Sequence, residues 1–303
     1  MGGGSWKDST WRSYKSSSGI SNARSAHQIY TQKTVKNEYL PYNVVREACD
    51  SDEHPNSSPI ILGLDVTGSM GHLLHTMADK LGVTMGEIYK RNVLPDPQIL
   101  CVAIDDFVSS DEECIQVTQF ESDIRIAEQL KQLKFIQYGA GNGWESYPLA
   151  WYFAARHTKC DAINKGRKGV IITMGDDGFQ SVISRSEIKI VFGDTLEKDL
   201  TTAELLSEVN RNWEVFHLTI AEGASYSSRV EKSAQDLLGS HAITVSDTDK
   251  IPEIIVSILQ TLRGDSVAGI AESWDGSTAV VVKEALSGLE ITPVNKDSEV
   301  VVF

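Results

Sequence analysis

The chain has 303 residues, of which 41% are hydrophobic, enough for one large α/β domain or for two smaller ones. Lys and Arg total 28 against 42 Asp and Glu, and a formal net charge of -14 repels phosphate backbones, so nucleic acid is not expected as a partner. No apolar run reaches the roughly 20 residues that span a bilayer, and the N-terminus lacks a secretory signal pattern. We therefore expect no membrane contact and a cytoplasmic location.

Residues 1–58 are rich in Ser, Lys, Asn and Tyr and show no sustained periodicity. This composition predicts an extended arm that is ordered only where its aromatic residues, such as Trp6, Trp11 and Tyr14, find a groove. Turn-forming residues are dense over 50–59 and mark a domain boundary. An ordered domain is therefore expected over 59–264.

Strand-like and helix-like segments alternate through that domain. Strands are predicted over 59–66, 98–107, 115–121, 168–175, 214–221 and 242–245. Helices are predicted over 73–89, 122–133, 146–158, 201–212, 228–238 and 252–262. Such alternation is typical of a Rossmann-like α/β fold, a doubly wound and mainly parallel sheet with helices on both faces.

The pattern weakens after Gly264. Residues 279–282 and 299–303 are predicted as two short strands around a polar turn at 293–297. Residues 265–303 are therefore expected to form a C-terminal extension, either as an addition to a sheet edge or as a small hairpin.

The most informative stretch is Asp65-Val-Thr67-Gly-Ser69, a turn between an apolar strand and a long helix. Ligands of doubly wound sheets gather at the carboxyl ends of the strands, where this turn brings a carboxylate and two hydroxyls. Such oxygen donors suit a hard cation such as Mg²⁺ or Mn²⁺. The alternative is a plain helix start, with Ser69 or Thr67 as N-cap and Asp65 stabilised by the helix dipole.

Two later loops are in the right order to complete such a site. Asp176 and Asp177 end another apolar strand, and a glycine-rich loop over 139–146 leads into a helix. Asp105 and Asp106 follow a further strand at the same edge, where a solvated loop or a role in holding metal-bound water is favoured over direct coordination.

Three other residues lie near these loops in the sequence: Trp144, His72 and His75. Trp144 is either a core residue covering the loop or an exposed anchor for a partner, and the sequence leaves both open. His72 and His75, on the first predicted helix, are expected to have surface or packing roles rather than to bind metal.

The turn is similar to the Asp-x-Ser-x-Ser element of the metal-ion-dependent adhesion site in von Willebrand factor A domains, and the resemblance covers residues 59–262. Thr67 stands in place of the commoner Ser and keeps the hydroxyl. Asp176 matches the Asp that the family carries at the end of its fourth strand. The resemblance implies one bound Mg²⁺, Mn²⁺ or Ca²⁺ and a partner protein that completes the metal shell with an acidic side chain.

The glycine-rich loop departs from the family pattern, which has a Thr there. Residues 141–146 contain no Thr, and their oxygen donors are Asn142, Glu145 and Ser146. We include Glu145 among the expected metal ligands. A further carboxylate would leave the metal less electrophilic, so the partner contact would differ from the single Asp or Glu usual in the family.

Within the family, the motifs at 65–71, 119–123 and 142–147 resemble a group of intracellular bacterial and phage proteins. This implies the host cytoplasm, or a virion if the chain is phage-encoded, and a non-enzymatic adaptor function. One alternative is a Mg²⁺-dependent phosphoester hydrolase, although haloacid dehalogenase-like phosphatases carry a second acid at the position of Thr67. Another is a structural component of a large assembly such as a phage particle.

Overall fold

The computed structural model describes residues 4–136 and 141–290. Its centre is a six-stranded sheet in the order β4-β3-β2-β7-β11-β12, in which all neighbouring strands are parallel except the antiparallel pair β3 and β4. These strands are β2 (Ser58–Asp65), β3 (Pro97–Ile104), β4 (Ile115–Val117), β7 (Gly169–Gly175), β11 (Trp213–Ile220) and β12 (Ala242–Val245). The predicted doubly wound α/β fold is confirmed.

The three central strands are apolar because helices cover both of their faces. Every residue of β2, β3 and β7 is buried. Successive side chains of β2 point to opposite faces, so that Ile60 and Leu62 join one hydrophobic cluster and Ile61 joins another.

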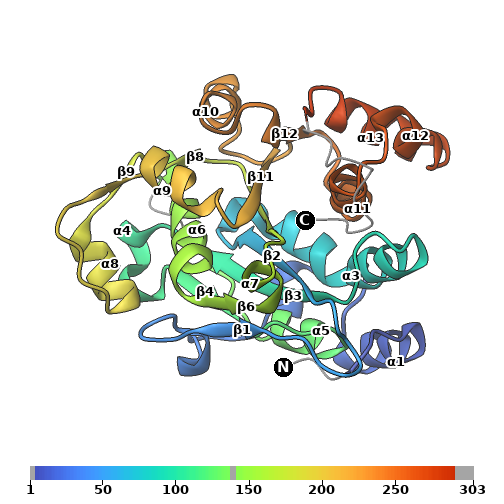
Figure 1. Cartoon of the computed structure of the whole chain (residues 1–303), viewed down its shortest axis with the longest axis horizontal. Coiled ribbons are helices and arrows are strands. Elements are labelled where there is room, and N and C mark those ends of the chain that lie inside the picture. Colours follow the sequence, from blue (N-terminus) through green and yellow to red (C-terminus); the bar gives the residue numbers. More distant parts are fainter. Residues whose placement is uncertain (1–3, 137–140, 291–303) are drawn as a thin grey trace.

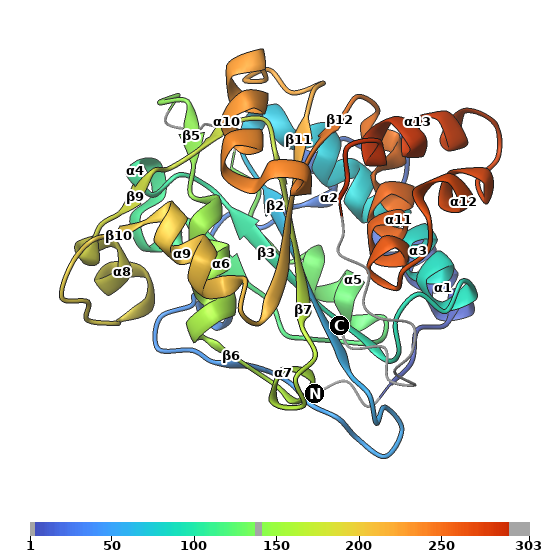
Figure 2. The ribbon, with the colours of Figure 1, turned by 45° about the horizontal axis from the view of Figure 1, so that its top comes forward.

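Helices on the two sides of the sheet complete these clusters (Figures 1 and 2). One cluster includes residues of α3 (Gly71–Lys90), α5 (Arg125–Leu130) and α11 (Ile251–Leu262). The other includes residues of α6 (Tyr147–Arg156), α8 (Arg185–Phe192) and α9 (Thr202–Val209). Within the described residues, no helix is both long and apolar enough to cross a bilayer.

The remaining elements are shorter or peripheral. They are α1 (Asp8–Ser18), α2 (Ala26–Ile29), β1 (Arg46–Ala48), α4 (Phe107–Ser110), β5 (Trp144–Glu145), β6 (Thr158–Cys160), α7 (Asp161–Asn164), β8 (Gly178–Phe179), β9 (Val182–Ile183), β10 (Leu200–Thr201), α10 (Ser228–Leu238), α12 (Val267–Glu272) and α13 (Gly276–Leu286).

The N-terminal segment differs from the extended arm expected there, because residues 8–18 form the helix α1. Trp11 is buried on α3, where a Cβ built on Gly82 would lie 2.1 Å from its indole Nε1. Lys15 adds an ion pair with Asp79 of α3 at 2.8 Å. The helix is polar apart from its aromatic residues, so that its order depends on a groove elsewhere in the chain.

The C-terminal segment also differs from expectation. Residues 279–282 belong to α13 and are not a strand, whereas residues 299–303 lie outside the described part of the chain. Val282 and Leu286, one helical turn apart, are buried in the same cluster as α11. Packing at helical spacing thus overrides the β propensity of the valine run.

We predict that Gly82→Ala destabilises the docking of α1, although Ala is favoured over Gly by about 1 kcal/mol in a helix interior. The added methyl group would overlap the Trp11 ring. In a Trp11→Ala background the same change should be stabilising, because the overlap is gone. Urea unfolding of the four proteins measures this reversal of sign, and hydrogen exchange locates it in α1.

Gly86→Ala is the matched control, since its Cβ would lie 3.7 Å from the nearest atom outside the helix, an ordinary contact with Asp8. It should be neutral or stabilising in both backgrounds. A Gly82→Ala protein as stable as the wild type would contradict the packing of Trp11 on α3.

Candidate metal centre

The site lies at the topological switch point of the sheet. Read from β4, the strand order corresponds to 3-2-1-4-5-6, so that the chain leaves the neighbouring strands β2 and β7 toward opposite faces. Asp65 is the last residue of β2, and Asp176 directly follows β7. A crevice opens between such strand ends, and this is where doubly wound folds bind ligands.

Two hydrogen-bonded pairs, Thr67 with Asp65 and Ser69 with Asp176, meet between the two strand ends. Asp65 Oδ1 accepts from the Thr67 N–H at 2.9 Å and from the Thr67 hydroxyl at 2.6 Å. The hydroxyl oxygens of Thr67 and Ser69 are 3.3 Å apart, and Ser69 donates to Asp176 Oδ1 at 3.2 Å. The structure therefore brings together the four residues predicted from the turn and the distant strand.

These contacts disagree with the alternative of a plain helix start. Thr67 precedes a short 3₁₀ turn, Gly68–Met70, but its side chain makes no capping hydrogen bond. The N-cap of α3 is Met70, which also lacks a side-chain cap. The hydroxyls of Thr67 and Ser69 point instead toward carboxylates.

The loop after β11 holds Asp176 from the other side. The Ser225 N–H donates to Asp176 Oδ2 at 2.8 Å. A Cβ on Gly223 would lie 2.2 Å from the Cβ of Asp176, so this close approach of the backbone requires glycine. The sequence carried no signal for either contact, because both join segments about 50 residues apart.

The glycine-rich loop reaches the site through a short strand pairing. Its β5 pairs in parallel with β8, the segment that follows Asp176 and Asp177. Of its three candidate donors, Asn142 bonds to the Asp106 carboxylate and to the Trp144 N–H, and Ser146 accepts from the Phe107 N–H.

Glu145 differs from those two donors. It is 3% exposed, and its Oε2 is buried without a hydrogen-bond partner among the described residues. A buried carboxylate oxygen without a donor is costly, unless a cation or a proton satisfies it.

Burial shapes the electrostatics of the site. Burial, with the charge of Asp176 adding, raises the pKa of Asp65 to about 7, despite hydrogen bonds from Thr67 and Tyr147. Burial also raises the pKa of Glu145 far above its ordinary value, and the charges of Asp65, Asp105, Asp106 and Asp177 act in the same direction. A divalent cation placed among these groups would reverse this preference by stabilising the ionised forms.

The donor set fits a hard cation when its hydroxyls are counted. Within residues 4–136 and 141–290, no three His, Cys, Asp or Glu side chains are arranged so that these groups alone could hold a metal ion. The structure brings together the carboxylates of Asp65 and Asp176 and the hydroxyls of Thr67 and Ser69, and Glu145 is near enough for the charge of Asp65 to add to burial in raising its pKa. Oxygen ligands of both kinds suit Mg²⁺, Mn²⁺ or Ca²⁺.

Asp105 and Asp106 are buried, so the interpretation of a solvated loop is wrong. Asp105 Oδ2 accepts from the hydroxyls of Ser109 and Ser110, and its Oδ1 is buried without a partner in the described residues. Asp106 caps α4 by accepting from the Val108 N–H at 3.1 Å. The two residues directly follow β3, and their charges act on Glu145.

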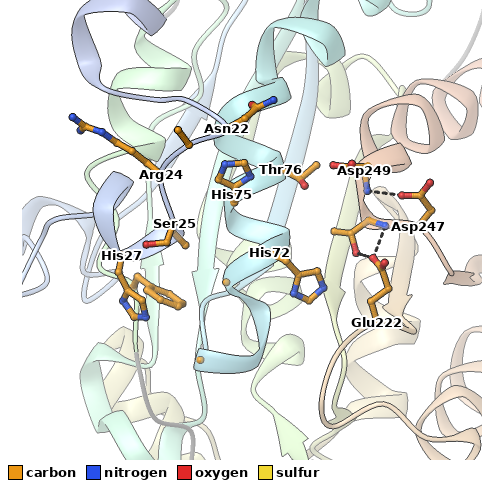
Figure 3. Close-up of a pocket in the computed structure, with 16 residues that line it drawn as sticks. Asn22, Arg24, Ser25, His27, His72, His75, Thr76, Glu222, Asp247 and Asp249 are labelled. Atoms are coloured by element: carbon orange, nitrogen blue, oxygen red, sulfur yellow. Dashed lines mark hydrogen bonds between the residues drawn. The ribbon is translucent and has the colours of Figure 1, made fainter.

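A hollow of about 800 Å³ adjoins the turn on its other side (Figure 3). Gly68 and Gly71 form part of its lining, and His72 points from α3 toward Glu222. Residues 22–27 form a second wall. His75 contacts the Ser21 carbonyl at 3.3 Å, in keeping with the packing role expected for it.

Trp144 lies at the surface of the site rather than in the core. Its side chain is 39% exposed, although the next residue, Glu145, is buried. The interpretation of Trp144 as a core residue covering the loop is therefore wrong, because its side chain is exposed.

The architecture is a doubly wound α/β fold, with the Asp-x-Thr-x-Ser turn at its switch point. No family model matches the sequence, and no curated protein matches it either. The chain is similar in structure to the pilus adhesin SpaC from Lactobacillus rhamnosus GG in its open conformation, with a TM-score of 0.48 and 9% identity over 71% of this chain and 31% of the adhesin.

Two further solved structures are similar at lower scores. Proximal thread matrix protein 1 from the mussel byssus, with a zinc-occupied MIDAS motif, has a TM-score of 0.40 and 13% identity over 73% of this chain and 47% of that one. The conserved hypothetical protein BatB from Bacteroides thetaiotaomicron has a TM-score of 0.39 and 13% identity over 69% of this chain and 100% of its own. The chain thus spans less than half the length of the adhesin and the thread matrix protein.

We predict that the cation-free protein loses stability as the pH rises from about 4 to about 7, because the folded-state pKa of Asp65 lies above the ordinary value of 3.8. The folded state then binds a proton more tightly than the unfolded state, and this contribution, about 4 kcal/mol at most, disappears with deprotonation. Mg²⁺ needs the ionised form, so its stabilising effect should be larger at pH 8 than at pH 5. Thermal unfolding in EDTA and in excess MgCl₂ across this range measures both trends.

Asp65→Asn removes the titrating group and should flatten both trends. A wild-type Mg²⁺ effect that is equal at the two pH values would contradict a buried Asp65 in contact with the cation.

Proposed function

We propose that the protein is a divalent-cation-dependent adaptor that binds a partner protein through a metal site of the adhesion type. Asp65, Thr67, Ser69 and Asp176 supply the oxygen donors, and Glu145 supplies the third loop. The observation that carries this proposal is the meeting of two hydrogen-bonded pairs, Thr67 with Asp65 and Ser69 with Asp176, across the switch point of the sheet. The partner would complete the metal shell with an acidic side chain.

The charge of the site limits how the partner is held. Three carboxylates around one divalent cation leave a net negative charge, so the metal retains less attraction for a further acid than it would with two. A partner therefore needs additional contacts beside the metal. Trp144 is suited to this, because exposed aromatic side chains are often the residues that contribute most to protein interfaces.

The same proposal makes the protein a non-enzyme. A haloacid dehalogenase-like phosphatase would carry its second acid two residues after Asp65, where this chain has Thr67. The Thr67 hydroxyl donates its hydrogen bond to Asp65. It is therefore arranged to hold the Asp65 carboxylate in place rather than to deliver a proton to a leaving group.

We expect Mg²⁺ to raise the melting temperature of the wild-type protein relative to EDTA, and Asp65→Asn to abolish this increase. The amide keeps the shape of the carboxylate but cannot supply its charge to the cation. Asp236→Asn is the matched control, since Asp236 lies on α10 in an exposed ion pair with Lys232 and should keep the full Mg²⁺ effect. Equal melting shifts in the wild type and in Asp65→Asn would rule out Asp65 as a ligand.

Capture of a partner should follow the same dependence. We expect Trp144→Ala to weaken partner binding by an order of magnitude or more, as is typical of an aromatic interface anchor, while leaving the Mg²⁺ melting shift unchanged. Binding would be measured by surface plasmon resonance, in Mg²⁺ and in EDTA, against a protein captured in Mg²⁺ and eluted with high salt. Tyr42→Ala is the control, because Tyr42 is an exposed aromatic residue outside the site, at 51% exposure.

Partner binding that persists in EDTA would sink the adaptor proposal. Unchanged binding by Trp144→Ala would leave the metal site intact but would place the interface elsewhere.

A further inference from the structure

Tyr147 contacts the candidate metal ligands from inside the protein. It is fully buried at the first position of α6, and its hydroxyl donates to Asp65 Oδ2 at 3.0 Å. We propose that Tyr147 is a positioning residue that fixes Asp65 for cation binding. This inference rests on the proposed metal site, and it gives Tyr147, the last residue of the motif at 142–147, a role that the sequence did not suggest.

The two oxygens of the Asp65 carboxylate have different partners. Oδ1 accepts both hydrogen bonds from Thr67, and Oδ2 accepts the one from Tyr147. The carboxylate is therefore held at both ends and cannot rotate without losing a bond. Because Thr67 gives its hydroxyl proton to Oδ1, the lone pairs of that hydroxyl remain available to a cation.

The packing around the phenol leaves little room for another arrangement. A Cβ on Gly175, in β7, would lie 1.9 Å from the Tyr147 hydroxyl and 2.8 Å from Asp65 Oδ2. The ring lies edge-on to Phe179 at 5.3 Å and packs against the His217 ring at 4.8 Å. Backbone and rings on several sides thus hold the phenol against Asp65.

The position of Tyr147 also connects two parts of the site. Glu145, two residues earlier, carries the buried oxygen without a partner, and Ser146 between them accepts from the Phe107 N–H at 3.0 Å. A hydrogen bond from Tyr147 therefore ties the start of α6 to the end of β2. Partners of this kind, which orient a metal ligand without touching the metal, commonly matter about 10- to 100-fold for metal affinity.

The test is Tyr147→Phe, which removes only the hydroxyl. The full chain, stripped with EDTA, is titrated calorimetrically with MgCl₂ and separately with CaCl₂. We expect the Mg²⁺ affinity to fall by about 10- to 100-fold. The Ca²⁺ affinity should fall less, because Ca²⁺ accepts a more flexible shell, so the preference for Mg²⁺ over Ca²⁺ declines.

Tyr152→Phe is the matched control for loss of a hydroxyl from the same helix. The Tyr152 hydroxyl donates to Asp194 at 2.7 Å, outside the metal site. Both variants should melt at a lower temperature in EDTA, but only Tyr147→Phe should change the metal affinities. A purely structural role of Tyr147 would not alter the relative affinities for the two cations.

The outcomes separate the two proposals. A wild-type protein that binds neither cation contradicts the proposed function. A wild type that binds Mg²⁺, with Tyr147→Phe binding it equally well, overturns only the role of Tyr147. If Tyr147→Phe does not fold, Phe179→Leu is the second variant, because it loosens the packing of the Tyr147 ring but keeps the Tyr147 hydroxyl. The inference then requires Phe179→Leu to bind Mg²⁺ more weakly than the wild type. Unchanged Mg²⁺ binding by Phe179→Leu overturns it.

Discussion

The hydrogen bond from Ser69 to Asp176 depends on the alignment of two strands. Leu64 of β2 is level with Met174 of β7, so that the parallel strands end side by side. Asp65 and Asp176 then face the same crevice from the ends of two strands, with a short turn and the hydroxyls of Thr67 and Ser69 between them. The helix α3 starts from that turn, and α6 starts at Tyr147. The positions of the candidate metal ligands are therefore coupled to the packing of helices on both faces of the sheet.

How far the sequence could predict this arrangement depends on how local each signal was. The buried strands β2, β3 and β7 were predictable because each is a continuous apolar run, and the Asp65 turn because its donors lie two residues apart. The contact of Tyr147 with Asp65 was not, although Tyr147 ends the motif at 142–147, because the two residues are 82 positions apart. The adjacent Asp105 and Asp106 suggested a solvated loop. Both are instead buried, and they accept hydrogen bonds from a hydroxyl of α4 and from the side chain of Asn142.

The N-terminal segment shows a different limit of prediction from sequence. A polar helix such as α1 has little tendency to form alone, and its order comes from Trp11 packing on a glycine in α3. Residues 22–27, which follow α1, line the hollow beside the turn at 65–69. A wall of the hollow beside the candidate site is therefore contributed by residues that the composition alone assigned to an arm.

The acidic residues around the candidate metal site affect how the cation would control partner binding by the proposed adaptor. Asp105, Asp106, Glu145 and Asp177 surround the site, and the whole chain carries a net charge of -14. An acidic partner approaching the edge without the cation meets repulsion from all of these groups. A bound cation would partly neutralise the nearest charges and would attract a carboxylate of the partner. The cation would therefore both remove a barrier and create the contact, so that partner binding and metal binding become linked equilibria in which each strengthens the other.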